Sequence, residues 1–450
     1  MKKLLLILTL LFGCFFYALA CLWDEDTIEM ERQHFPSVIE LISGKFLRHS
    51  PEFYYWRIKD RKEKLNKFPD SLSLYDDLAV SYSKTGAHKK AIEVILKKDR
   101  IKPDEYETYA NLGTFFLHDG QFQKGVGLIA KAIDINPQAH FGREIYQKYL
   151  AEYVLSKMHD GKISLPLDPT FPSNSFDYYG GLEKSNNFYN YLIRKYASKP
   201  GNTLENSDYT LPYRELEKAV IGIMGMMKFG NHTSPILLEA LGDLLLNKGD
   251  DNGARHLAAR AYLRASYQVD DEQAEKIYRK KVEYTIQHQV TKEKGGSFSV
   301  HALEKLLKEE IKEGDRFYKK IKNDEIKWIN SDKDPELAFA EKYYYEPKIS
   351  RRRQHSDIPI GYATGRYLDD TTIGKIVDFR PVAEQKNMSE YEADSSARKL
   401  VEELRSIEKP DTKRQKSFIY NKKNLFFGVL ALFIIITGGF WYKKRGKNED

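Results

Sequence analysis

The stretch YANLGTFFLHDGQFQKGVGLIAKAIDINP, from Tyr109 to Pro137, contains the spacing that decides the fold. The stretch before it, LSLYDDLAVSYSKTGAHKKAIEVILKKDRIKP from Leu72 to Pro103, has the same residue types at the same intervals. Each matched position lies 34 residues further along in the second stretch: Tyr75/Tyr109, Leu78/Leu112, Ala79/Gly113, Tyr82/Phe116, Gly86/Gly120, Ala91/Gly125, Ile95/Ile129 and Pro103/Pro137. A constant offset over a whole unit predicts a structural repeat.

The residue types within each unit are those needed by two antiparallel helices. Small residues let the two backbones approach closely, aromatic and aliphatic residues fill the space beside them, and a glycine permits the turn. A proline ends the second helix. We assign helix packing to Ala79, Tyr82, Ala91, Gly113, Phe116 and Gly125. One such unit cannot bury its apolar face alone, so neighbouring units must stack.

A third stretch, residues 235–268, has the same internal spacing, and there we assign Gly242 and Ala254 to packing. The period and residue pattern resemble those of the tetratricopeptide repeat (TPR) superfamily. The resemblance implies an all-α solenoid of helical hairpins. The segment CLWDEDTIEMERQHFP, from Cys21 to Pro36, is also similar to the start of uncharacterised exported bacterial TPR proteins. Neither resemblance implies an enzymatic activity.

Both ends of the chain contain an apolar run. Lys2 and Lys3 precede an uncharged run that closes with Ala18-Leu19-Ala20, which is typical of a cleaved secretory signal peptide. Lipidation of Cys21 is the alternative. The second run, from Leu425 to Tyr442, has the length and the terminal aromatic residues of a transmembrane helix. We therefore expect the body to be exported and the tail to be cytoplasmic.

These features predict an order of segments. We expect a signal peptide at 1–20, an N-terminal helical array at 22–160, an irregular insertion at 161–213 and a second TPR-like segment at 214–290. A long amphipathic helix region at 300–346, a flexible linker at 347–423, a transmembrane helix at 424–442 and a cytoplasmic tail at 443–450 follow.

The distribution of charge and cysteine along the chain argues against some classes of function. The net charge of the 450 residues is +7, but much of the excess lies in clusters within the last hundred residues, beside the apolar run. This distribution favours a membrane protein over a nucleic-acid-binding protein. The two cysteines, Cys14 and Cys21, are both near the N-terminus, so the body can form neither an internal disulfide nor a thiolate metal site.

The chain contains none of the common catalytic or phosphate-binding motifs. We therefore expect no enzymatic activity, cofactor or metal. An acidic cluster formed by Asp24, Glu25, Asp26, Glu29 and Glu31 lacks the spacing of a calcium loop, and we interpret it as a solvated first turn of a helix. The alternative is an envelope enzyme or accessory subunit with a site outside the repeats.

Stacked units of this kind offer the first helix of each pair to a partner. We predict a concave protein-binding surface formed by Asp76, Val80, Ser83, Glu107, Ala110, Thr114, Leu117, Glu239 and Asp243. Its acidic and polar character favours an extended, neutral or basic protein segment. The alternative is that the chain's own insertion, 161–213, occupies this surface. The hypothesis is a membrane-anchored scaffold for another envelope protein.

Overall fold

A computed structural model of the chain describes residues 24, 30, 35–137, 142–170, 186–199, 210–248, 252–287 and 299–344. The expected signal peptide, Cys21, the linker, the transmembrane helix and the tail all lie outside these residues. In the described part of the chain the backbone is helical, and one isolated β-bridge joins His159 and Lys162. The prediction of an all-α fold is confirmed for these residues.

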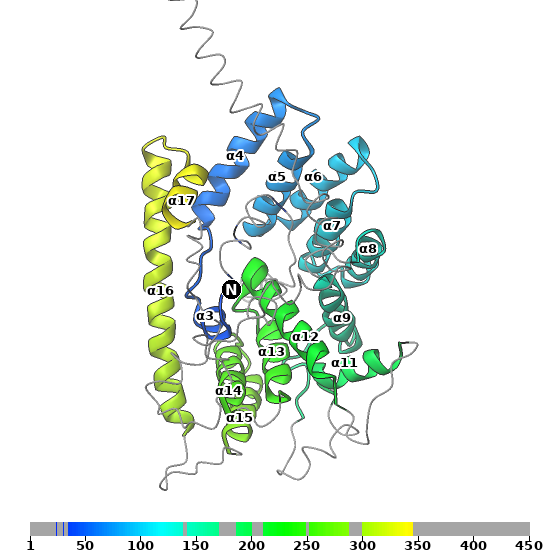
Figure 1. The fold of residues 1–450 in the computed structure, drawn as a ribbon, viewed down its shortest axis with the longest axis vertical. Coiled ribbons are helices and arrows are strands. Elements are labelled where there is room, and N and C mark those ends of the chain that lie inside the picture. The colour runs from blue at the N-terminus through cyan, green and yellow to red at the C-terminus, as the bar shows by residue number, and fades with distance from the viewer. Residues whose placement is uncertain are drawn as a thin grey trace, which may run out of the picture. The chain divides into compact units, whose positions relative to one another are not determined.

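Figure 1 shows the helices in chain order, and the connections between consecutive helices are short from α4 to α8. They are α3 (Val38–Ser43), α4 (Pro51–Lys67), α5 (Leu72–Lys84), α6 (His88–Ile101), α7 (Tyr106–His118), α8 (Phe122–Ile135), α9 (Glu144–Ser156), α11 (Phe188–Ala197), α12 (Tyr213–Met226), the π-helical turn η3 (Met227–Asn231), α13 (Pro235–Leu246), α14 (Asn252–Ser266), α15 (Glu272–Gln287), α16 (Val300–Asn330) and α17 (Pro335–Tyr343).

Helices that are consecutive in the sequence pack against each other from α4 to α9 and again from α12 to α15. The turns inside the pairs α5–α6 and α7–α8 contain Gly86 and Gly120, whose φ angles are 79° and 78°. A side chain at such an angle would be strained, so glycine is the residue that suits these turns. The 34-residue spacing therefore corresponds to one helix pair in the structure.

Glycines also lie where paired helices approach most closely. A Cβ atom on Gly113 would be 2.7 Å from Ile129 Cγ1, and one on Gly125 would be 2.6 Å from Leu117 Cδ2. On α13, a Cβ on Gly242 would be 2.5 Å from the ring of Tyr262. Among the other residues assigned to packing, Ala79, Ala91 and Ala254 are buried, and Tyr82 and Phe116 are half-buried.

The largest hydrophobic core is formed by buried residues of α12, α13 and α14 together with residues of α3, α9 and α11. A second core lies among α5, α6 and α7. Helix α16 contacts α3, α4, α14, α15 and α17, so this helix joins the first part of the described chain to the later helices (Figure 1). This arrangement determines which helices surround each polar cluster described below.

Candidate functional site

The residues predicted to form the concave surface lie mostly inside the helical body. Asp76, Val80, Ser83, Ala110, Thr114, Leu117, Glu239 and Asp243 are buried, and Glu107 is half-buried. The structure therefore places most of them between packed helices, in separate groups around α5–α7 and around α13. A partner could contact the buried members only if the surrounding helices moved.

Asp76 shows how an inner-face residue of the pairs α5–α6 and α7–α8 contacts neighbouring helices. Its carboxylate accepts hydrogen bonds from Lys98 Nζ at 2.6 Å and from Asn111 Nδ2 at 3.2 Å. Burial raises the pKa of Asp76 to about 7, although Lys98 opposes the shift. These contacts join α5 to α6 and α7, so Asp76 acts within the stack of helices.

Ser83 and Thr114 have similar roles. Ser83 Oγ lies 3.2 Å from Nδ1 of His118 on α7, the next helix pair. Gln147 on α9 donates a hydrogen bond of 2.9 Å to Thr114 Oγ1. Ser83 and Thr114 thus each contact a side chain of the helices that follow their own pair.

Glu239 and Asp243 on α13 face the insertion instead. The carboxylate of Glu239 accepts hydrogen bonds from two consecutive backbone N–H groups, Leu167 N at 2.8 Å and Asp168 N at 3.0 Å. Asp243 accepts one from Phe188 N at 3.1 Å, at the start of α11. At this helix pair, the described parts of the insertion occupy the predicted inner surface.

Three further side chains complete this group, which we call the α13 acid cluster: Glu239, Asp243, Tyr262, Tyr278 and Lys281. Tyr278 OH donates to Glu239 at 2.8 Å, and Tyr262 OH donates to Asp243 at 2.8 Å. Lys281 Nζ lies 3.2 Å from Glu239 and 3.8 Å from Asp243. Burial raises the pKa of Asp243 to about 7, against the effect of Lys281.

Chemically, the α13 acid cluster is an acceptor for peptide N–H groups. One carboxylate that binds two successive amides holds a short stretch of main chain whatever its side chains are, because the contacts are made to the backbone. The buried lysine balances part of the negative charge that these acceptors would otherwise leave in a region of low dielectric.

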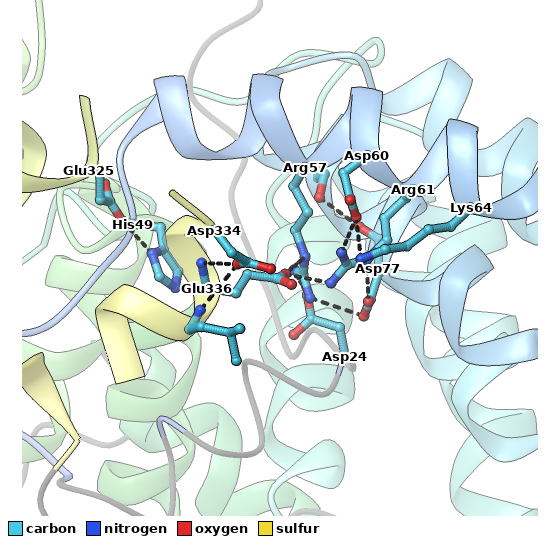
Figure 2. Close-up of polar contacts among 12 residues, drawn as sticks. Asp24, His49, Arg57, Asp60, Arg61, Lys64, Asp77, Glu325, Asp334 and Glu336 are labelled. Carbon is cyan, nitrogen blue, oxygen red and sulfur yellow. Dashed lines mark hydrogen bonds and ion pairs between the residues drawn. The ribbon is translucent and has the colours of Figure 1, made fainter. Parts of the chain in front are cut away.

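A second polar group joins α4, α5 and α17 and includes Asp24; we call it the Arg57 cluster (Figure 2). The guanidinium of Arg57 lies 2.7 Å from Asp24 Oδ2, 3.0 Å from Asp77 Oδ1 and 2.8 Å from Glu336 Oε1. Arg61 Nε lies 2.7 Å from Asp77 Oδ2, and Arg61 also pairs with Asp60 and Glu336.

Within the Arg57 cluster, burial and ion pairing have opposite effects on the pKa values. Burial raises the pKa of Asp77 even though both arginines oppose the shift. For Arg61, burial by itself would lower the pKa, but the carboxylates of Asp77 and Glu336 outweigh it and the pKa lies above its usual value. Arg61 is therefore charged, and the two arginines pair with carboxylates from several segments.

This cluster corrects one prediction. We expected Asp24 in the solvated first turn of a helix, whereas its side chain is buried and paired with Arg57. The partner lies 33 residues away in sequence, so no local pattern could reveal it. One feature of the sequence did point to buried anions near α4. Phe53, Arg57 and Arg61 are spaced to lie on one face of the helix, and two arginines on a buried face require anionic partners.

A third group lies at the junction of α16, α17 and the start of α4. His49 Nδ1 contacts the buried Glu325, which also accepts a hydrogen bond of 2.9 Å from Ser50 N (Figure 2). The His49 ring stacks on Phe53 with centroids 3.7 Å apart and lies 4.1 Å from Phe339. These contacts fix the second half of α16 to α4.

No group of three or more His, Cys, Asp or Glu side chains in the described ranges has the arrangement of a metal site. None of the helices described combines the length and the apolar character needed to cross a membrane.

Comparison with known proteins gives one match. Residues 421–450 match the family model of the LPXTG cell wall anchor motif. A search of the curated proteins gives no match to the chain. Together with the helical body, the match indicates an exported protein of the bacterial envelope. The matched residues contain the apolar run and the basic tail, and no Leu-Pro-x-Thr-Gly stretch occurs in the 450 residues.

Proposed function

We propose that the chain is a TPR-type scaffold, held at the exported face of the bacterial membrane, that binds another envelope protein. The observation that carries the proposal is the match of residues 421–450 to a cell-surface anchor, placed after a body of paired helices. The 34-residue period and the close glycine contacts within the pairs support the TPR assignment. Stacked helical pairs generally present extended surfaces to protein partners.

Anchoring is proposed to occur through the apolar run itself, with the body outside and residues 443–450 in the cytoplasm. Support comes from the match to an anchor without the pentapeptide that names the motif. Cell fractionation tests this. We expect detergent to release the full chain from membranes, and release only after peptidoglycan digestion would overturn membrane anchoring in favour of wall attachment.

Partner binding is proposed to use exposed side chains of the repeats, because most of the predicted inner residues are engaged within the chain. Ile101 at the end of α6 and Ile135 at the end of α8 are each 42% exposed and occupy equivalent positions 34 residues apart. Equivalent positions of stacked units lie in a row. A protein that spans consecutive pairs would meet both apolar side chains.

Cross-linking and purification from membranes tests this surface. The double variant Ile101→Ser/Ile135→Ser should reduce recovery of the partner about tenfold while the chain remains folded. The matched control is Tyr213→Ser/Leu337→Ser, which removes two exposed apolar side chains from α12 and α17. Unchanged recovery with the first variant, or equal loss with both, would contradict the assignment.

A further inference from the structure

Helix α16 has two faces of opposite character. Its buried residues are Leu303, Leu307, Gly314, Ile321 and Glu325. At 100° per residue, Arg316, Lys319, Lys320, Asn323 and Lys327 lie on the opposite side, and all of these are exposed. The four cations among them, which we call the α16 basic face, extend over about 17 Å of the helix.

The charge of the α16 basic face is only partly balanced within the described part of the chain, where Glu309 interacts electrostatically with Arg316 and Asp324 with Lys320. None of its four cations forms an ion pair with a described carboxylate. In the first half of α16, by contrast, Lys308 pairs with Glu304 at 3.1 Å and Lys312 with Glu309 at 2.7 Å. In the second half, Lys322 pairs with Glu52 at 2.7 Å, whereas the four cations of the α16 basic face have no described carboxylate at ion-pair distance.

Acidic residues along this part of α16 also contact groups outside the α16 basic face. Asp324 pairs with Lys342 at 2.5 Å, and Glu325 is buried against His49 and Ser50. Asp315 interacts electrostatically with Arg48 and Arg264, which lie toward the body. The exposed surface therefore presents positive charge to any anion that approaches it.

Two segments that connect to the ends of the chain meet beside this half of α16. Met30 packs with Ile321 and with Phe339 of α17. One guanidinium, that of Arg57, binds both Asp24 and Glu336 of α17 (Figure 2). Asp24 is three residues from Cys21, and α17 is the last described helix before the apolar run at 425–442.

We propose that the α16 basic face docks on the anionic headgroups of the membrane in which the chain is anchored; the inference rests on the proposed anchoring. Charge complementarity supports it, as does the attachment of the segment after the export signal and of the last described helix beside this half of α16. Each cation near an anionic membrane surface contributes about fivefold to association. The interaction is electrostatic, so salt should weaken it.

Amine footprinting of the full chain in vesicles tests the proposal. The protein is reconstituted in phosphatidylcholine alone or in phosphatidylcholine with phosphatidylglycerol, and lysine acetylation is read by mass spectrometry. We expect labelling of Lys319, Lys320 and Lys327 to fall at least about threefold in the anionic vesicles and to recover at about 1 M salt. Exposed Lys89 and Lys97 on α6 serve as internal controls and should not change.

Charge reversal on α16 provides a second test of the proposed docking. In Lys319→Glu/Lys320→Glu, the protection of Lys327 should be lost, whereas the matched reversal Lys89→Glu/Lys97→Glu should leave it intact. Equal labelling of the α16 lysines in both vesicles, or equal protection of Lys89 and Lys97, would overturn the proposal. Protection by anionic wall-polymer fragments in neutral vesicles, with none from anionic lipid, would overturn it in favour of a wall polymer.

Failure of anchoring can be distinguished from failure of docking. Flotation with neutral vesicles reports insertion of the apolar run independently of the α16 basic face. If the chain does not float with neutral vesicles, the proposed anchoring is refuted. Flotation with anionic vesicles then measures docking by the α16 basic face alone. If anchoring fails, docking is supported when the wild-type chain floats with anionic vesicles and the Lys319→Glu/Lys320→Glu variant does not. Docking is refuted when the wild-type chain does not float with anionic vesicles.

Discussion

A Cβ atom on Gly314 would lie 2.1 Å from the carbonyl oxygen of Ser43, so α16 crosses the end of α3 in direct backbone contact. A carbonyl oxygen that ends a helix cannot retreat as a flexible side chain can. The glycine at this position therefore determines how closely α16 approaches the rest of the body.

Gly314→Ala should lower the free energy of unfolding by about 1–3 kcal/mol, because the added methyl group overpacks a backbone contact. Thermal unfolding of the detergent-solubilised full chain, followed by circular dichroism, measures the change. The matched control is Gly127→Ala on α8, where an added Cβ meets nothing within 4 Å. That control should be stabilised by up to about 1 kcal/mol through helix propensity, and a stable Gly314→Ala variant would contradict the described contact.

Arg57→Met should destabilise the chain by about 3–5 kcal/mol, since it leaves Asp24, Asp77 and Glu336 without their shared cation. Arg57→Lys should lie in between, because a single ammonium group cannot reach three carboxylates as a guanidinium does. Denaturant unfolding measures both. Lys64→Met is the control, as Lys64 is 43% exposed and pairs only with Asp60 among the described residues, and its loss should cost less than about 1 kcal/mol. Equal effects at positions 57 and 64 would refute a structural role for the Arg57 cluster.

Glu239→Gln should loosen the insertion locally, because the amide NH₂ would face a backbone N–H that now donates to a carboxylate oxygen. Hydrogen exchange at Leu167 and Asp168 should accelerate about tenfold or more, whereas exchange in α7 should not change. Glu283→Gln, at an exposed position of α15, is the matched control. Unaltered exchange at Leu167 and Asp168 would show that the α13 acid cluster does not hold this segment.

Asp76 should impose a pH dependence on stability. Its pKa is raised by burial to about 7 in the folded chain, against about 3.9 for an unfolded aspartate. The folded state therefore binds more protons between these values, and the free energy of unfolding should decrease as pH rises from about 4 to about 7, by at most about 1.4 kcal/mol per pH unit. Asp76→Asn should make this slope shallower by the contribution of Asp76, while Asp243, whose pKa is also about 7, keeps its own contribution. Asp134→Asn at an exposed position of α8 should leave the slope unchanged. Parallel profiles for Asp76→Asn and the wild-type chain would contradict the assignment.

The sequence by itself determined the helical class and the pairing of helices in the repeats. The spacing of Gly113 and Gly125 is local information, since each residue lies against the adjacent helix of its own pair. Turn glycines, closing prolines and apolar periodicity act over one hairpin, so a 34-residue period can encode them. The same reasoning covers the amphipathic character of α16.

Only the tertiary structure decided which polar residues are buried. The period identifies Glu239 and Asp243 as inner-face positions, but the chain segment that reaches them comes from about 55 to 72 residues earlier. The partners of Arg57 likewise come from residue 24, from α5 and from α17. A buried charged side chain requires a nearby opposite charge, but its position in the sequence does not show which distant segment supplies that charge. The packing of α4, α13 and α16 against the rest of the chain determines the partner.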